Sequence, residues 1–144
     1  MAQYKTHLRF NLFLALPVLL GLLGSFFHPS SPQWIIFTSC FIYASLFMNP
    51  DLDLAYKFKL LSLRGLLGFP FWLYSFFFRH RGISHYPILG TLSRLLWLGG
   101  FLYLGYFIFF SIESPTLLFF DYREEFFYGI GAIFLADLCH LALD

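Results

Sequence analysis

Histidine and aspartate side chains gather at four places in the sequence, each beside an apolar segment. One lies before the first segment, two follow the second, two precede the third, and two end the fourth. Imidazole and carboxylate groups together suit zinc, manganese or iron. The sequence therefore predicts a site for a divalent metal ion, with zinc first and manganese or iron as alternatives. Its candidate ligands are His7, Asp51, Asp53, His80, His85, His140 and Asp144.

The two middle groups have spacings that allow their side chains to converge in turns. Asp51 and Asp53 are two positions apart, so they share one side of an extended segment but not of a helix. Gly82 lies between His80 and His85 and permits a turn that brings the two rings together. Each group also has a simpler interpretation, because an Asp-x-Asp after a helix is usually a cap or a solvated turn. A histidine among arginines at a membrane edge is usually an interfacial residue, and the sequence leaves these alternatives open.

The C-terminal group has a helical spacing. Asp137, His140 and Asp144 stand at positions i, i+3 and i+7, which form one stripe along a helix. Asp137 is also an ionisable residue inside an apolar segment, where a charge is costly and is functional by default. Two roles for Asp137 are equally consistent with the sequence. It could pair with Arg94 at a similar depth, or it could lie beside the metal without binding it.

The composition is typical of a membrane protein. Apolar residues make up 59% of the chain and charged residues 12%, and 22 residues are Phe. Soluble domains carry about 25% charged residues, so membrane lipid is the expected surrounding of this surface. A net charge of +1, with no basic stretch among the aromatic residues, argues against nucleic acid as a partner. Cys40 and Cys139 both lie inside apolar runs, where small buried side chains are expected.

Four apolar segments are long enough to cross a bilayer, which takes about 17–25 residues. They are Phe10–Phe27, Gln33–Asn49, Pro87–Ile112 and Phe126–Leu143. A fifth segment, Gly65–Phe78, has Pro70 in its middle and is too short to cross comfortably, so it is expected to be re-entrant or interfacial. The expected fold is therefore all-α, a single helical membrane domain over residues 1–144. It would contain about four transmembrane helices and this one short segment.

Basic residues indicate the orientation of these segments through the positive-inside rule. Eight of them lie on one side of the membrane if the short segment does not cross: Lys5, Arg9, Lys57, Lys59, Arg64, Arg79, Arg81 and Arg94. Arg123 lies on the opposite side, among acidic residues. Both termini and residues 51–86 are therefore expected in the cytoplasm. All candidate metal ligands share that side, whereas His28 lies on the other and is expected to be interfacial.

The order of these residues resembles that in known bacterial membrane proteins. The motifs are Thr6-His7, Pro50-Asp51-Leu52-Asp53, Arg79-His80-Arg81-Gly82-Ile83-Ser84-His85 and His140-x-x-x-Asp144. They resemble a family of uncharacterised bacterial membrane proteins described as metal-binding, and they are similar to inner-membrane metal-dependent hydrolases. The resemblance spans nearly the whole chain and implies a multi-helix fold in the bacterial inner (plasma) membrane. It also implies that all seven candidate ligands form one metal site, whereas Asp137 lies outside the motifs.

The leading hypothesis for function is a membrane-embedded, metal-dependent hydrolase. Two divalent ions can activate water and hold a phosphoryl group during in-line displacement. Arg79 or Arg81 would bind the phosphoryl oxygens, and a site at the headgroup level suggests a phosphoester substrate at the cytoplasmic face. No Gly-x-Ser-x-Gly motif supports a serine hydrolase. The alternatives are a non-catalytic metal binder, such as a metal-stabilised scaffold or a transport accessory protein, and a purely structural membrane protein.

Overall fold

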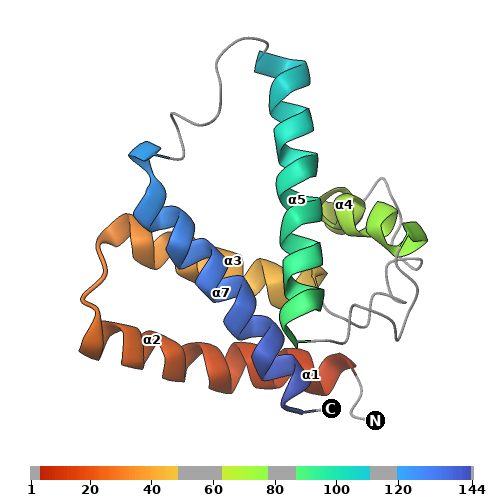
Figure 1. Cartoon of the computed structure of the whole chain (residues 1–144). Helices are drawn as coiled ribbons and strands as arrows, with labels where there is room; N and C mark the ends of the chain where they lie inside the picture. Colours follow the sequence, from red (N-terminus) through yellow and green to blue (C-terminus); the bar gives the residue numbers. More distant parts are fainter. Residues whose placement is uncertain (1–3, 49–62, 78–86, 111–119, 144) are drawn as a thin grey trace. The chain divides into compact units, whose positions relative to one another are not determined.

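The computed structural model of the chain describes residues 4–48, 63–77, 87–110 and 120–143. Every secondary-structure element in these ranges is a helix (Figure 1), which confirms the predicted all-α class for the described residues. The chain divides into two compact units, one formed by Met1–Asn49 with Glu124–Asp144 and the other by Pro50–Arg123. The single domain over residues 1–144 stays a prediction.

The first unit begins with a long helix made of three consecutive segments. They are α1 (Tyr4–Phe10), the π-helical η1 (Asn11–Ala15) and α2 (Leu16–Phe26). At the end of η1 the amide of Leu16 donates to the carbonyl of Asn11, five residues back. This wider turn lies directly before Pro17, whose ring would clash with the carbonyl four residues earlier in an α-helix. Such π turns are rare and occur often at functional sites.

The first helix ends at a left-handed residue, and a new helix follows within a few positions. His28 has a φ of 50°, a conformation that commonly ends helices. The next helix, α3 (Ser31–Phe47), has Pro32 in its first turn, where the missing N–H of proline does no harm. The backbone amide of Ser30 donates to Oε1 of Gln33 at 2.8 Å, which satisfies one group at the start of the helix. The helix therefore begins before Gln33, where the sequence predicted its start.

Helix α7 (Arg123–Leu141) completes the first unit and packs closely against α3. A Cβ atom on Gly129 would lie 3.3 Å from Sγ of Cys40 and 3.4 Å from Cγ2 of Ile36. Small residues at a helix contact let the two backbones approach each other. The buried apolar side chains of this unit are Ala15, Leu16, Phe37, Phe41, Ala44, Met48, Ala132, Ile133 and Ala136.

The second unit contains α4 (Leu63–Phe77) and α5 (Pro87–Phe110). Pro70 lies inside α4, and its carbonyl accepts a hydrogen bond of 2.7 Å from Nε1 of Trp97 on α5. Proline inside a helix usually kinks or breaks it, and here a side chain of the neighbouring helix binds at the same place. The short segment predicted at Gly65–Phe78 is thus a helix that packs on α5.

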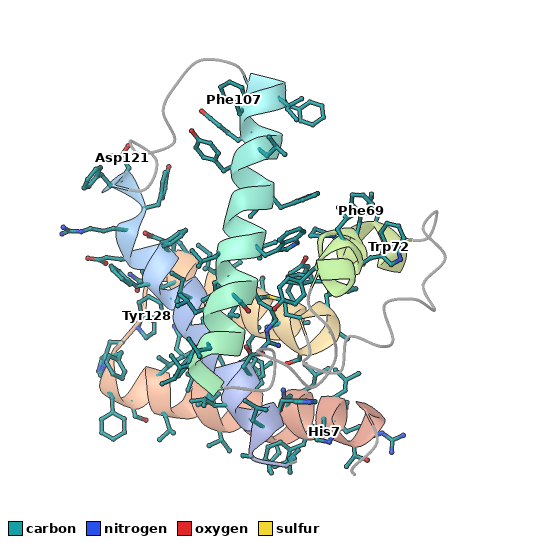
Figure 2. All side chains as sticks on the ribbon, turned by 45° about the vertical axis from the view of Figure 1, so that its right-hand side comes forward. His7, Phe69, Trp72, Phe107, Asp121 and Tyr128 are labelled. Carbon is teal, nitrogen blue, oxygen red and sulfur yellow. The ribbon has the colours of Figure 1, made fainter. Side chains whose placement is uncertain are left out.

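Aromatic and hydroxyl groups extend the contact between α4 and α5. The hydroxyl of Tyr74 lies 2.8 Å from Oγ of Ser93. The ring of Phe69 meets that of Phe101 edge-on, with centroids 6.0 Å apart. Figure 2 shows Phe69 and Trp72 together on α4, and their ring centroids are 6.0 Å apart. The two helices are therefore joined by polar as well as apolar contacts.

Two described helical stretches, Thr6–Phe26 and Ile88–Phe109, are long and apolar enough to cross a membrane. Gly65–Tyr74 is a shorter apolar helix. The predicted number of about four spans is not supported by the other two helices. Helix α3 has 17 residues, and α7 begins with charged residues and buries both Asp137 and His140. Continuous apolar segments in the sequence thus do not all become long, uniformly apolar helices.

Candidate functional site

His7 and His140, from opposite ends of the chain, meet inside the first unit. Their ring centroids are 4.2 Å apart and the ring planes are tilted by 37°. The side chains are 0% and 3% exposed, respectively. His7 lies on α1 (Figure 2), and the C-terminal end of α7, which carries His140, lies beside α1 (Figure 1). The two rings are therefore buried side by side, and imidazole is the commonest protein ligand of metal ions.

Asn11 lies about one helical turn after His7 and is 2% exposed. Its Nδ2 donates to Oγ of Ser45 on α3 at 3.2 Å and to the carbonyl of Ala136 on α7 at 3.1 Å. One amide therefore links three helices of the unit near the histidine pair. The sequence analysis did not single out this residue, although its signal is present: an amide inside an apolar segment, four positions after a candidate ligand.

Asp137 is also buried, with 2% of its surface exposed. It precedes His140 by three residues on α7, so the two side chains lie on the same side of that helix. Arg94 is fully buried as well, and its Nε donates to the carbonyl of Gly90 at 3.0 Å. Arg94 belongs to the second unit and Asp137 to the first. Both predicted roles of Asp137 therefore stay predictions.

The other predicted site residues lie outside the described part of the chain. These are the metal-ligand candidates Asp51, Asp53, His80, His85 and Asp144, together with the two candidate catalytic arginines, Arg79 and Arg81. Within residues 4–48, 63–77, 87–110 and 120–143 there is no group of three or more His, Cys, Asp or Glu side chains that could hold a metal ion. The described residues thus bring together two of the candidate ligands, His7 and His140.

The comparisons with known proteins place this chain in a family. A family model described as "Uncharacterized metal-binding protein (DUF2227)" matches residues 2–144. The chain is similar to an uncharacterized protein of Aquifex aeolicus (strain VF5), with 34% identity over 130 residues that cover 72% of this chain and 84% of the relative. No solved structure matches the chain. Because the family model covers nearly the whole sequence, the chain belongs to the uncharacterized metal-binding protein family DUF2227.

Proposed function

We propose that this protein is a membrane-embedded metal-binding protein with its metal site at the cytoplasmic face. The observation that carries the proposal is the buried contact between His7 and His140, whose rings lie 4.2 Å apart. Neutral imidazole is the commonest protein ligand of metals. A pair of imidazoles from two different helices is a usual way to hold an ion between them. Membership of a family described as metal-binding supports the same chemistry.

The proposed site adds the remaining candidate ligands to this pair: Asp51, Asp53, His80, His85 and Asp144. The bond between Asn11 and Ser45 holds the C-terminal part of α3 beside the first helix, and Asp51 follows Met48 by only three positions in the sequence. Asp144 follows His140 by four positions. Chain length therefore permits carboxylates to reach the imidazoles. A mixed set of nitrogen and oxygen donors suits zinc first, with manganese or iron as alternatives.

The membrane part of the proposal rests on apolar side chains that are exposed in both units. Phe13 and Phe26 on the first helix are 79% and 74% exposed, and Phe107 and Phe109 on α5 are 64% and 82% exposed. Figure 2 shows Phe107 on α5. Such surfaces are unfavourable in water and mark contact with a partner or a membrane. Lipid around these helices would remove these apolar side chains from water. The four-span arrangement would place α3 and α7 in the bilayer as packing partners of the first helix.

The metal content of the purified protein tests the proposal. Protein extracted in mild detergent without chelator is expected to carry stoichiometric metal, and His7→Ala and His140→Ala are expected to lose most of it. Asp53→Ala and His85→Ala extend the test to ligands outside the described residues. His28→Asn is the control, because His28 is exposed and asparagine tolerates its left-handed backbone. Wild-type protein without metal would contradict the proposal. Full metal content in the His7 and His140 variants would exclude that pair as ligands.

The catalytic part of the proposal is hydrolysis of a phosphoester at the cytoplasmic face. Bound divalent ions supply the activation of water and the orientation of the phosphoryl group. Arg79 and Arg81 flank His80 in the sequence and would stabilise charge on the phosphoryl oxygens. Arg79→Gln and Arg81→Gln are each expected to lower hydrolysis about 10²–10³-fold without removing metal. Metal-loaded protein that hydrolyses neither a soluble phosphomonoester nor phosphatidic acid in vesicles would favour a non-catalytic scaffold or transport accessory role.

A further inference from the structure

Asn11 is a buried polar residue that the proposed metal site does not itself use. It is 2% exposed, and both hydrogen bonds of its Nδ2 reach other helices, at Ser45 and at the carbonyl of Ala136. Its Oδ1 accepts no hydrogen bond from any residue that the structure describes. Buried polar groups are favourable where they are hydrogen-bonded, and the two bonds of Nδ2 join the first helix to α3 and α7.

The hydrogen bond between Asn11 and Ala136 joins the same two helices as the contact between His7 and His140, with an equal offset from the histidine on each helix. Asn11 follows His7 by four positions, and Ala136 precedes His140 by four positions. Four residues are about one turn of an α-helix. The Asn11–Ala136 bond is therefore a second link between the same two helices, one turn away from the contact between the rings. The carbonyl of Ala136 is also the helical acceptor position for the amide of His140, so the bond is made to the turn that carries this ligand.

The bond to Ser45 brings in the third helix of the unit. Ser45 lies in the last turn of α3, close to the point where the chain continues toward Asp51 and Asp53. The side chain of Asn11 thus joins the helix that carries His7, the helix that carries His140, and the end of α3, which the sequence continues toward Asp51 and Asp53. Hydrogen bonds are directional, so an amide that bonds to α3 and α7 at once restricts how far these two helices can slide along the first helix more than apolar contacts do.

We propose that Asn11 is a positioning residue that holds His140 in register with His7 and holds the end of α3 beside both, before any metal binds. The inference rests on the proposed metal function, because it concerns how those ligands are placed. Ligands that are already in position bind more tightly, since less freedom is lost on binding. Partners that orient metal ligands typically change metal affinity about 10–100-fold when they are removed.

A matched control separates positioning from ordinary helix packing. Nε2 of Gln33 donates to Oε2 of Glu124 at 3.0 Å, so a second amide joins α3 to α7 far along the helices from the histidines. Asn11→Leu and Gln33→Leu each replace an amide by an apolar side chain of similar size. A purely structural role would give the two variants similar behaviour, whereas a positioning role affects the histidine pair only in Asn11→Leu.

The first readout uses protein without metal. His7→Cys and His140→Cys are combined in a chain that also carries Cys40→Ser and Cys139→Ser, and a short thiol-specific cross-linker is added. Adding Asn11→Leu is expected to slow cross-linking several-fold, and adding Gln33→Leu is expected to leave the rate unchanged. If Asn11→Leu does not fold, Ser45→Ala removes one of the two hydrogen bonds and is expected to slow cross-linking partly. Equal rates in the Asn11 or Ser45 variant and in the control would overturn the inference.

The second readout is zinc affinity in the chain with both histidines, measured by competition with a coloured chelator. Asn11→Leu is expected to bind zinc about 10–100-fold more weakly, while Gln33→Leu binds as the wild type does. Wild-type affinity in Asn11→Leu would overturn the inference and leave the proposed metal function intact. No zinc binding by the wild type, together with slower cross-linking in Asn11→Leu, would reject the metal function and keep the role of Asn11 in aligning the two positions.

Discussion

Gly129 determines how closely α3 and α7 approach in the first unit. A Cβ at this position would already lie 3.3 Å from Cys40 Sγ and 3.4 Å from Ile36 Cγ2, so a branched side chain forces the helices apart. We expect Gly129→Val to lower the free energy of unfolding by about 1–3 kcal/mol, as overpacking of a core usually does. Denaturant unfolding in detergent, followed by helical circular dichroism, measures the change.

Gly131 provides the control on the same helix. A Cβ built at Gly131 meets no heavy atom within 4 Å, and valine changes the helix propensity equally at both positions. The difference between Gly129→Val and Gly131→Val therefore isolates the contact with α3. Equal stabilities of the two variants would show that α3 and α7 do not pack as described.

Among single residues, the sequence predicted those with recognisable metal-binding chemistry better than those that only hold helices together. His7 and His140 were candidates from their types and positions, and the structure brings their rings together. Asn11 and Ser45 were missed, because an amide or hydroxyl in an apolar run belongs to no motif. The spacing of four positions from His7 marks Asn11 as a neighbour of a candidate ligand, but its hydrogen bonds to α3 and α7 depend on how three helices are aligned, which the spacing along one helix does not show.

Among the helices, the interior of each element was predicted more accurately than its ends. The predicted fourth segment began at Phe126, but α7 begins at Arg123. Its first turn contains Glu124 and Glu125, which are favourable at the positive end of a helix dipole. A search for apolar runs excludes charged residues and therefore misses such turns. The same reason explains why the first helix begins at Tyr4 rather than at the predicted Phe10.

The bond between Trp97 Nε1 and the carbonyl of Pro70 is one of the contacts that attach α4 to α5. Trp97→Phe removes this donor and keeps an aromatic ring. We expect a loss of about 0.5–1.5 kcal/mol, the usual net value of one hydrogen bond. Hydrogen–deuterium exchange should rise in α4 and stay unchanged in α7. Tyr103→Phe is the control, since Tyr103 is exposed on the same helix. Faster exchange in both variants would contradict the assigned role of this bond.

For the whole molecule, the testable prediction is the orientation that the protein would have in the proposed membrane. We predict that both termini and residues 51–86 face the cytoplasm, because the basic residues concentrate there. Single cysteines at Ser62 and Ser84, in a chain with Cys40→Ser and Cys139→Ser, should both react with an impermeant probe from the cytoplasmic side. Tyr122→Cys should react from the opposite side. Reaction of positions 62 and 84 from opposite sides would divide the proposed ligands between two faces and contradict a single metal site.

The π turn in the first helix has a consequence for insertions and deletions. The hydrogen bond at the end of η1 spans five residues, one more than in an α-helix. The residues before η1 are therefore rotated by about 100° from the positions that an uninterrupted α-helix of the same sequence would give them. Deleting Phe13, which is 79% exposed, would let the α-helical ladder run through. The π turn uses five residues for about the rotation that four residues make in an α-helix, so this deletion removes the extra residue and keeps the phase of the turn before it. We therefore expect His7 to stay beside His140, and cross-linking at those two positions to persist. The π turn would thus mark one inserted residue that the helix absorbs without rotating the turn that carries His7.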